Sequence, residues 1–345
     1  LESRVTNPRG DGRAGGACAA SREQWRRPSR RARANRSTCA TASPTCPRAA
    51  ANATLPTLLS ETGLYADVAR QTPAPGVRPY QPRFQLWSDG AEKRRWFALP
   101  PGATIDTRNM NDWVFPVGTR FWKEFTRDGV RVETRLIQRT GPGPLDWAFM
   151  AYVWNAAGTD AVATPGGVTD ARGTAHDVPS ADRCVGCHGG RASRVLGFSA
   201  IQLSRTDTPP SVTLRDLVAE GLLSAPPARD FELPGNETER AALGYLHANC
   251  GHCHNSARPP RQGARCYDPQ RELDFWLRVE ALGSPGATPT YASAVGRVVE
   301  PGHPECSDVI DLMSRRSGGL QMPPLATERV DSAGVALLTT WIAGM

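Results

Sequence analysis

The chain lacks two features that would narrow its class at once: a long apolar run, and a charge imbalance beyond its first residues. No stretch approaches the roughly 18 consecutive apolar residues that a membrane crossing needs, so the sequence predicts no transmembrane helix. The net charge of +7 in 345 residues is concentrated in residues 1–50, which hold 11 arginines and three acidic residues. Beyond residue 50 acidic and basic side chains nearly cancel, so nucleic-acid binding has no support there.

The visible sequence also lacks an export signal. It begins at Leu1, and no apolar segment follows the basic run from Arg26 to Arg36. Residues 1–53 have the composition of a disordered basic tail. Two interpretations stay open: a mis-called or missing start, and a genuine tail that gives peripheral association with anionic membrane surfaces.

One five-residue motif is present twice, as CVGCH (184–188) and CGHCH (250–254). C-x-x-C-H is the attachment signature of c-type haem: the thiols add to the haem vinyl groups, and the histidine is the proximal iron ligand. A random chain of this composition would hold roughly 0.004 such motifs. The sequence therefore predicts two covalently bound haem c groups, attached through Cys184, Cys187, Cys250 and Cys253, with His188 and His254 as proximal ligands.

The second haem has a clear candidate for its distal ligand. Met322 lies in the segment QMPPL (321–325), where the two prolines restrict the loop and lower the cost of ordering the thioether at an iron. The alternative is a methionine of the core, but a position between a Gly-Gly turn and two prolines is poorly placed for packing. We expect His254/Met322 ligation.

The first haem has no local methionine, because none occurs between Met150 and Met313. Its distal ligand must therefore be a histidine or come from elsewhere. The candidates, in order, are His247 on the helix that leads into the second motif, His176 on the preceding connector, and Met313. A five-coordinate haem with an open position remains an alternative, and an open position would permit chemistry.

Five cysteines lie outside the motifs: Cys18, Cys39, Cys46, Cys266 and Cys306. A disulfide between Cys266 and Cys306 is plausible in an oxidising compartment, and two unpaired thiols are the alternative. Covalent c-type haem is assembled outside the bacterial cytoplasm. Both considerations predict a periplasmic or extracellular protein of a bacterium.

Residues 54–175 read as a β-rich domain after a short helix within residues 54–75. Six of the nine tryptophans lie between residues 77 and 165, where apolar runs alternate with turn signals. Arg127-Asp-Gly129 has the composition of a hairpin turn. These patterns predict an antiparallel β-sandwich.

Residues 176–345 read as helices and loops, with a unit for the first haem at 176–235 and one for the second at 236–345. Amphipathic helices are predicted at 213–223, with Thr213 as N-cap, at 236–249, with Asn236 and Glu239 as a capping box, and at 330–344. The expected fold class is therefore α+β and multidomain, a sandwich followed by an all-α di-haem region.

Several longer phrases accompany the motifs. They include LSETGLYAD (59–67), LWSDGAEKRRWFALP (86–100), DWVFPVGTRFWKEF (112–125), VETRLI (132–137), YVWNAAGTDA (152–161), VPSADRCVGCH (178–188), VLGFSAIQL (195–203), YLHANCGHCHN (245–255) and QMPPL (321–325). In these the chain resembles, over residues 55–345, a bacterial family of di-haem c-type cytochromes with an N-terminal β-rich domain. Its last helices also resemble class I cytochromes c.

The resemblance implies electron transfer outside the cytoplasm and marks His247 as a functional residue. It implies a signal peptide or lipoprotein anchor where residues 1–54 match nothing. The leading hypothesis is an electron carrier with an unidentified redox partner protein, for which the β-rich domain would be the docking module.

Two other classes of function remain. A di-haem peroxidase or dehydrogenase needs an open or displaceable site at the first haem and an acid/base group beside it. Glu220, Asp230 and Glu232 lie between the motifs, although solvated surface carboxylates explain them more simply. A binding or sensing protein could stack sugars on Trp87 and Trp113, which are otherwise residues of the core.

Overall fold

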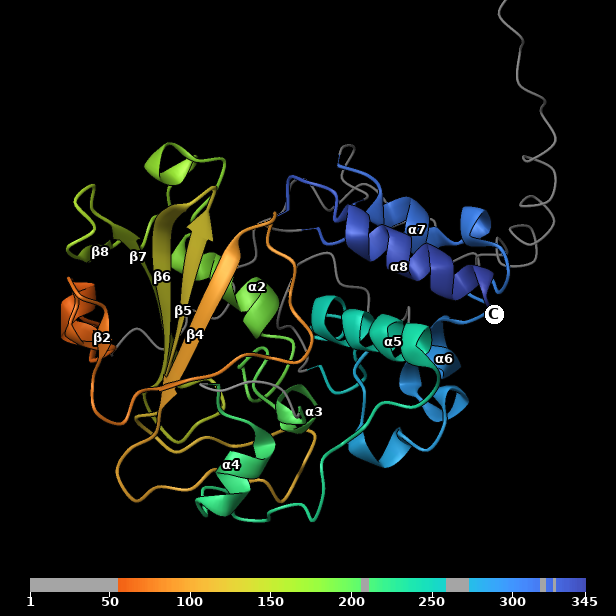
Figure 1. Cartoon of the computed structure of the whole chain (residues 1–345), viewed down its shortest axis with the longest axis horizontal. Helices are drawn as coiled ribbons and strands as arrows, with labels where there is room; N and C mark the ends of the chain where they lie inside the picture. Colours follow the sequence, from red (N-terminus) through yellow and green to blue (C-terminus); the bar gives the residue numbers. More distant parts are fainter. Residues whose placement is uncertain (1–54, 206–210, 259–272, 317–320, 325–326) are drawn as a thin grey trace, which may run out of the picture.

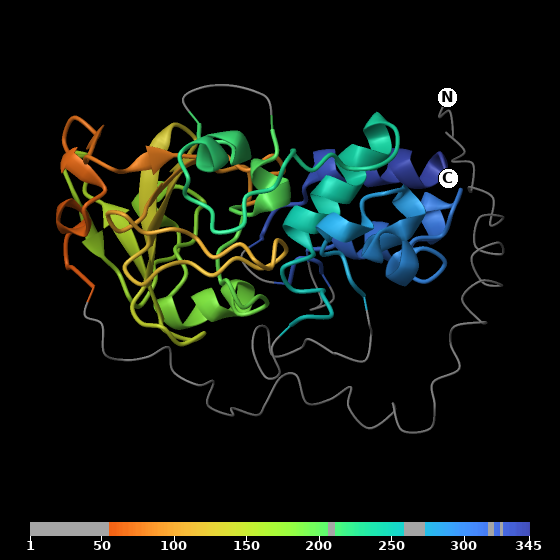
Figure 2. The ribbon, with the colours of Figure 1, turned by 90° about the horizontal axis from the view of Figure 1, so that it is seen from below.

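The computed structural model describes residues 55–205, 211–258, 273–316, 321–324 and 327–345. Within them every named strand lies between Tyr65 and Ala163, and the α-helices follow. Figures 1 and 2 show the two parts side by side, the sheet on the left and helices α5 to α8 on the right. The predicted combination of antiparallel sheet and helices, a mixed α+β fold, is confirmed.

The main sheet has six antiparallel strands that are neighbours in sequence order. They are β3 (Arg78–Pro79), β4 (Glu92–Ala98), β5 (Arg120–Arg127), β6 (Val130–Arg139), β7 (Trp147–Trp154) and β8 (Ala161–Ala163). A separate ribbon pairs β1 (Tyr65–Asp67) with β2 (Thr72–Pro73). The predicted sandwich is wrong, because the described strands form one meander and a small ribbon rather than two facing sheets.

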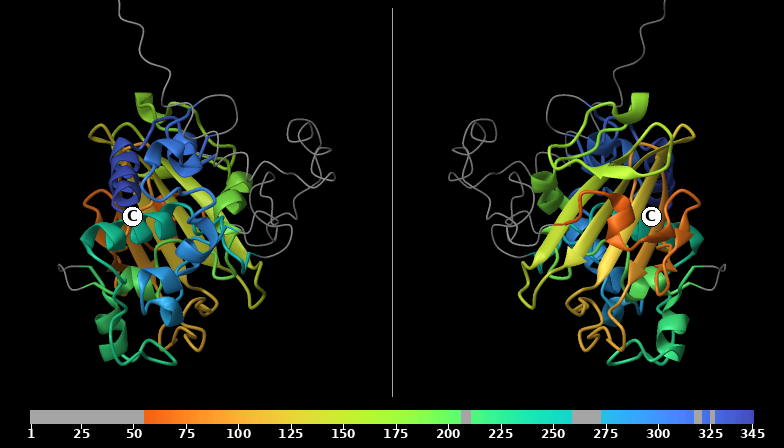
Figure 3. Two further views of the ribbon diagram at one scale, coloured as in Figure 1. Left: turned by 90° about the vertical axis from the view of Figure 1, so that its right-hand side faces the viewer. Right: turned by 90° about the vertical axis from the view of Figure 1, so that its left-hand side faces the viewer.

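The two faces of the main sheet have different covers. Trp96, Trp122 and Leu136 occupy successive register positions on one face, beneath Leu59 and Leu64 of the N-terminal segment. Figure 3 shows that segment in front of the sheet in its right-hand view. The N-terminal segment thus covers the face of the sheet that a second sheet was expected to cover.

The opposite face packs against the helical half. Phe97 and Phe121 belong to one buried cluster with Phe198 and with Leu203 of α3 (Ala200–Leu203). Phe198 lies 4.7 Å from Phe97, ring centre to ring centre. This face therefore joins the sheet to the part of the chain that carries the motifs.

Turn chemistry explains the hairpin and corrects the N-terminal prediction. Asp128 and Gly129 have φ of 49° and 77°, as a tight hairpin between β5 and β6 requires, which confirms the predicted turn. The helix predicted within 54–75 is only the 3-10 turn η2 (Leu59–Thr62). Gly63, at φ 77°, ends it, and β1 follows.

The other helices are mostly short. They are α2 (Cys184–His188), α4 (Leu214–Ala219), α5 (Glu237–Asn249), α6 (Pro289–Ala294), α7 (Asp308–Met313) and α8 (Ser332–Ala343). Single 3-10 turns are η3 (Ala171–Gly173), η4 (Ala181–Arg183), η6 (Val279–Ala281), η7 (Pro285–Ala287) and η8 (Pro304–Cys306). The three helices predicted from the sequence are present as α4, α5 and α8. Helix α4 is shorter than predicted and ends before Gly221, which has a φ of 67°.

The start of α5 follows its predicted capping box. The Asn236 side chain accepts a hydrogen bond of 3.0 Å from the Glu239 N–H, and the Glu239 carboxylate accepts one of 2.8 Å from the Asn236 N–H. Two amides that the helix leaves unpaired are thus satisfied.

Helix α5 packs on α8, as Figure 1 shows. A Cβ at Gly334 would lie 2.3 Å from the Tyr245 hydroxyl oxygen, so glycine allows the close approach. Tyr245 donates a hydrogen bond of 2.9 Å to Asp331, which caps α8. The helix before the second motif is therefore fixed against the end of the chain.

Candidate functional site

The first motif forms the whole of α2, so one helical turn places Cys184 and Cys187 on the same edge. His188 Nδ1 lies 2.7 Å from the backbone carbonyl of Arg194. Because a carbonyl only accepts, Nδ1 carries the proton and the lone pair is left on Nε2. Metal-ligating histidines are commonly oriented in this way.

The surroundings of His188 favour its neutral form. The Phe149 ring lies 5.4 Å away. Burial, and then the nearby charge of Lys123, lowers the pKa of His188 to about 3. The imidazole is therefore held in the protonation state that can bind a metal.

The second motif begins at Cys250, the C-cap of α5, and turns back on itself. The His254 N–H donates to the Cys250 carbonyl at 2.8 Å, and the Phe275 N–H donates to the His254 carbonyl at 2.9 Å. The Phe275 ring stands edge-on to the His254 ring at 5.9 Å. Cys250 borders the apolar cluster between α5 and α8.

The two motifs touch each other. Cys253 Sγ donates a hydrogen bond of 3.9 Å to the Gly186 carbonyl of the first motif, and the thiols of Cys253 and Cys187 outweigh burial and raise the pKa of His252 to about 10. A Cβ at Gly190 would lie 1.7 Å from the His252 carbonyl oxygen, so the two backbones meet there. The Asn255 amide closes the contact by donating to the Gly190 carbonyl at 3.2 Å.

Sequence reasoning missed this contact. The only sequence signals were the Gly-Gly pair after His188 and the His-Asn content of the second motif, and neither identifies its partner. His252 Nδ1 is buried with no hydrogen-bond partner among the described residues.

Four basic side chains lie together on the face of the sheet that packs against the helical half, and we call them the basic cluster. Arg95, Lys123 and Arg135 lie directly opposite one another across β4, β5 and β6. Lys93 lies on the same face of β4, because side chains alternate along a strand. Among the 41 basic residues of the chain, Lys93 and Lys123 are the only lysines.

Arg95 of the basic cluster is buried, and Lys93, Lys123 and Arg135 are half-buried. Burial, together with the other three cations, holds the pKa of Lys123 well below its usual range. Burial, with Arg95 and Arg135, lowers the pKa of Lys93 to about 7. The Arg135 side chain is nevertheless 26% exposed, so the cluster is not sealed from water.

The basic cluster also adjoins the thiols of the first motif. Burial raises the pKa of Cys184 to about 11, and the charge of Arg135 opposes that effect. Arg135 and Lys123 both interact electrostatically with Cys187. No sequence pattern indicated the cluster, because its members come from three strands.

His176, the second candidate for the distal ligand of the first haem, is buried rather than on a mobile connector as expected. Its Nε2 lies 2.7 Å from the Glu133 carboxylate. Glu133 also accepts a hydrogen bond of 2.5 Å from Arg135. Burial raises the pKa of Glu133, but Arg135 and His176 outweigh that effect and lower it.

His247, the first candidate, is buried against Trp276, 4.3 Å from it between ring centres. Its Nδ1 accepts a hydrogen bond of 3.1 Å from the Leu277 N–H, so in the neutral ring Nε2 carries the proton. The cavity beside it is about 10 Å³, the space of about one water. These contacts count against His247 as the distal ligand of the first haem. That role of His247 stays a prediction.

The two methionine candidates lie in different settings. Met313 is 5% exposed and packs in the cluster between α5 and α8, beside the second motif rather than the first. Met322 is half-buried, and its N–H donates to the Leu312 carbonyl at 3.0 Å. Met322 as distal ligand of the second haem stays a prediction.

Other predicted residues have structural partners. Surface ion pairs join Glu220 to Arg78, Asp230 to Arg215 and Glu232 to Arg83. Trp113 is 2% exposed and belongs to the core, so it cannot stack on a sugar, whereas Trp87 is half-buried.

Cys306 is disulfide-bonded. Its predicted partner Cys266 lies outside the described residues, as do Cys18, Cys39 and Cys46, so the pairing stays a prediction. The same holds for the character of residues 1–53.

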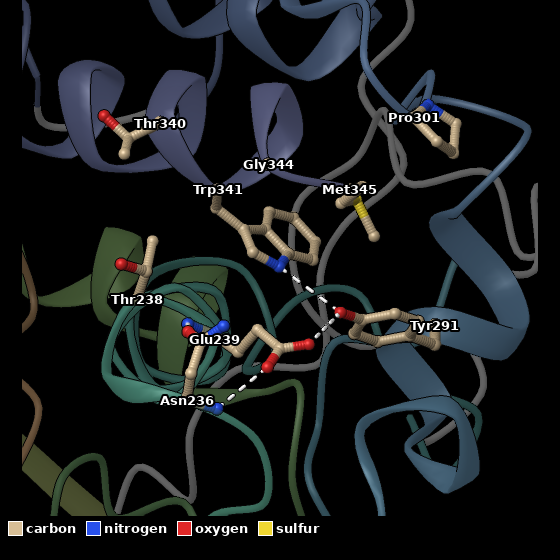
Figure 4. A pocket seen from close by; sticks show the side chains of 9 residues that line it. All are labelled: Asn236, Thr238, Glu239, Tyr291, Pro301, Thr340, Trp341, Gly344 and Met345. Atoms are coloured by element: carbon tan, nitrogen blue, oxygen red, sulfur yellow. Dashed lines mark hydrogen bonds between the residues drawn. The ribbon is translucent and has the colours of Figure 1, made fainter.

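One cavity lies away from both motifs. It has a volume of about 550 Å³ and is lined by the first turn of α5 and the end of α8. Figure 4 shows its polar groups bonded to one another: Tyr291 donates to Glu239 at 3.0 Å, and the Trp341 indole N–H lies 3.4 Å from the Tyr291 oxygen. The polar groups that line this cavity therefore cap α5 and bond to one another.

Among the described residues, no group of three or more His, Cys, Asp or Glu side chains could hold a bare metal ion. No helix in those same ranges is long and apolar enough to cross a membrane.

No protein-family model, curated protein or solved structure matches the chain.

Proposed function

We propose that the chain is a di-haem c-type cytochrome that transfers electrons outside the cytoplasm, with one haem on each C-x-x-C-H motif. The observation that carries the proposal is the contact between the motifs: Cys253 Sγ lies 3.9 Å from the Gly186 carbonyl oxygen, although the two residues are 67 positions apart in sequence. Two unrelated cysteine pairs have no evident reason to meet, whereas two electron-carrying groups exchange electrons only when they are close.

The residues around the first motif fit a haem. His188 is neutral and keeps Nε2 available, while Nδ1 is held by the Arg194 carbonyl. Haem, when bound, supplies an iron that accepts and releases one electron. The chain's own part is to attach the ring through Cys184 and Cys187 and to orient His188 beneath it.

The residues around the second motif support a class I-like unit. Cys250 is the C-cap of α5, which packs on α8, and the Phe275 ring stands edge-on to the half-buried His254. In this proposal Cys250 and Cys253 attach the second haem, His254 is its proximal ligand and Met322 its distal ligand.

The proposal includes a redox partner protein and a periplasmic or extracellular location in a bacterium. The disulfide at Cys306 supports an oxidising compartment. The β-rich domain would serve as scaffold for the first haem and as docking module for the partner.

Covalent haem content tests the proposal. The full chain is produced with an export signal in a bacterium that assembles c-type cytochromes, and haem is counted by haemochrome absorbance and protein mass. We expect two haems in the wild type and one in each of C184A/C187A and C250A/C253A. His303→Ala is the control, because this exposed histidine pairs only with Glu305 and should keep both haems. A wild type without haem contradicts the proposal.

One observation favours a second function, catalysis at the first haem. His176 and Glu133 form a buried acid/base pair beside Arg135, which adjoins the thiols of that motif. The reduced spectrum with carbon monoxide, and the oxidised spectrum with peroxide, decide between the two functions. If neither haem binds an added ligand, the enzyme hypothesis fails and the electron carrier remains.

A further inference from the structure

The basic cluster poses a problem that the fold alone does not solve. Arg95, Lys123 and Arg135 occupy directly opposed cross-strand positions, where like charges destabilise a sheet. The next residue in the same row, on β7, is Ala151, which has no charge to offset them. Buried charges persist in proteins when they are paired, so an anion is expected over this row.

The acidic groups near the cluster are already engaged. Glu133 is bonded to Arg135 and also to His176. Asp331, whose charge acts on Lys93, caps α8 through the Gly334 N–H at 3.0 Å and accepts from Tyr245. The Glu133 carboxylate is thus the one acidic group that remains for the four cations of the basic cluster.

The cations themselves are under-satisfied. Arg95 is 3% exposed, and its Nη1 has no hydrogen-bond partner among the described residues. Lys93 donates to the backbone carbonyl of Leu86, a neutral acceptor. Of the four cations in the basic cluster, Arg135 alone has a salt bridge among the described residues, and its partner is Glu133.

The position of the cluster matches the shape of haem. Arg135 and Lys123 interact with the thiols of the first motif, the row continues from them across the sheet to Arg95, and Lys93 lies two residues from Arg95 along β4. Haem carries its two carboxylates on the edge of the porphyrin away from the two vinyl groups that cysteines attack. A row of cations that starts at the thiols and leads away from them lies where those carboxylates would extend.

We infer that Lys93, Arg95, Lys123 and Arg135 bind the two propionate carboxylates of the haem attached at Cys184 and Cys187. The inference rests on the proposed function and adds a set of positioning residues to it. It also accounts for the use of lysine: a flexible stem with a compact charge can reach a carboxylate that hangs from a fixed ring. The chain uses its two lysines here and nowhere else.

The midpoint potential of each haem in Lys123→Met is the first test, with Lys123→Arg as the charge-conserving control. The oxidised haem carries one more positive charge than the reduced haem, so removing a nearby cation stabilises the oxidised form. We expect the oxidised-to-reduced ratio of the first haem to rise about tenfold, which lowers its potential by about 59 mV. The second haem should shift less, and Lys123→Arg should stay close to wild type.

The outcomes separate the inference from the proposed function. A wild type without haem overturns both. Two haems with an unshifted first haem, or a larger shift at the second, overturn the inference alone. If Lys123→Met loses the first haem altogether, recovery of that haem in Lys123→Arg supports the inference, and continued loss overturns it.

Lysine labelling is an independent readout, because the chain has only two side-chain amines. An amine-acylating reagent is applied to wild type and to C184A/C187A, and modification of Lys93 and Lys123 is followed by mass spectrometry. Carboxylates beside these amines raise their pKa, and each unit of pKa lowers the reactive free amine about tenfold. Slower labelling in the wild type supports the inference, with the N-terminal amine as internal control. Equal labelling in the two proteins overturns it.

Discussion

The two motifs share a chemical pattern but have opposite kinds of support. The second is the end of a 13-residue capped helix, α5, which packs on α8. The first is a five-residue helix, α2, held by a loop carbonyl at Arg194 and faced by a sheet whose residues come from much earlier in the chain. One site is built locally and the other by tertiary contacts.

The difference extends to electrostatics. The second motif lies against an apolar cluster that includes Leu246 and Trp341. The first lies beside the basic cluster and the buried pair of Glu133 and His176. If both carry haem, we expect the first to be tuned mainly by charge and the second mainly by its axial methionine.

The largest expected effect comes from separating the motifs with Gly190→Ala. The new Cβ would lie 1.7 Å from the His252 carbonyl oxygen, which belongs to the backbone and cannot rotate away. We expect a loss of about 3 kcal/mol or more in the free energy of unfolding, measured in urea. Gly283→Ala, where nothing lies within 4 Å of the new Cβ, is the matched control. Equal stability of the two variants would show that the motifs do not pack as described.

The second prediction sharpens the contrast in axial ligands. Met322→Ala should lower the potential of the second haem and remove the long-wavelength absorbance band that methionine ligation produces. The first haem should change little, because its candidate ligands lie elsewhere. Redox titration followed in the visible spectrum checks this, with Met313→Leu as control in the same apolar cluster. An unchanged second haem would remove Met322 as its ligand.

The third prediction tests the packing of α5 on α8, which holds the second motif in place. Gly334→Val would force a side chain against the Tyr245 ring, at a position where the Cβ alone meets the hydroxyl oxygen at 2.3 Å. Because a side chain can shift more easily than a backbone, we expect a loss of about 2 kcal/mol. Thermal unfolding of this variant and of Gly344→Ala, whose Cβ has a nearest contact of 3.5 Å, measures it. If the absorbance spectrum changed at the first haem instead of the second, the packing of α5 on α8 would support the first motif, which contradicts this account.

The last effect is a pH dependence and concerns charge at the first motif. In C184A/C187A, which lacks the first haem, Lys93 has a folded-state pKa of about 7, below its usual 10.5. Between these values the unfolded chain binds the extra proton, so stability should rise as pH increases from about 7 to about 10. Lys93→Met in the same background should make that rise less steep, with Lys123 contributing the remainder, as urea unfolding at several pH values would show. An equally steep rise without Lys93 would assign it to other groups.

What could be predicted from the sequence follows the same division. Helix α5, its Asn236 cap and its packing on the last helix are encoded within short windows, so periodicity and capping rules found them. The hairpin at Asp128-Gly129 is equally local. The sandwich was mispredicted because apolar runs in the strands indicate that both faces of the sheet are covered and do not show by what.

The basic cluster was out of reach for a different reason. Arg95, Lys123 and Arg135 become neighbours only through the register of three strands, and a slip of one residue would send each to the other face. The meeting of Gly190 with His252 likewise depends on how two loops pack. No window of the sequence contains either contact.

The contact between the motifs is the central claim, and paramagnetic resonance tests it most directly. In the fully oxidised wild type the two ferric haems should broaden or split each other's signals by spin–spin interaction. Each of C184A/C187A and C250A/C253A should show one undisturbed signal. A wild-type spectrum equal to the sum of those two would mean that the haems lie apart, and would contradict the account.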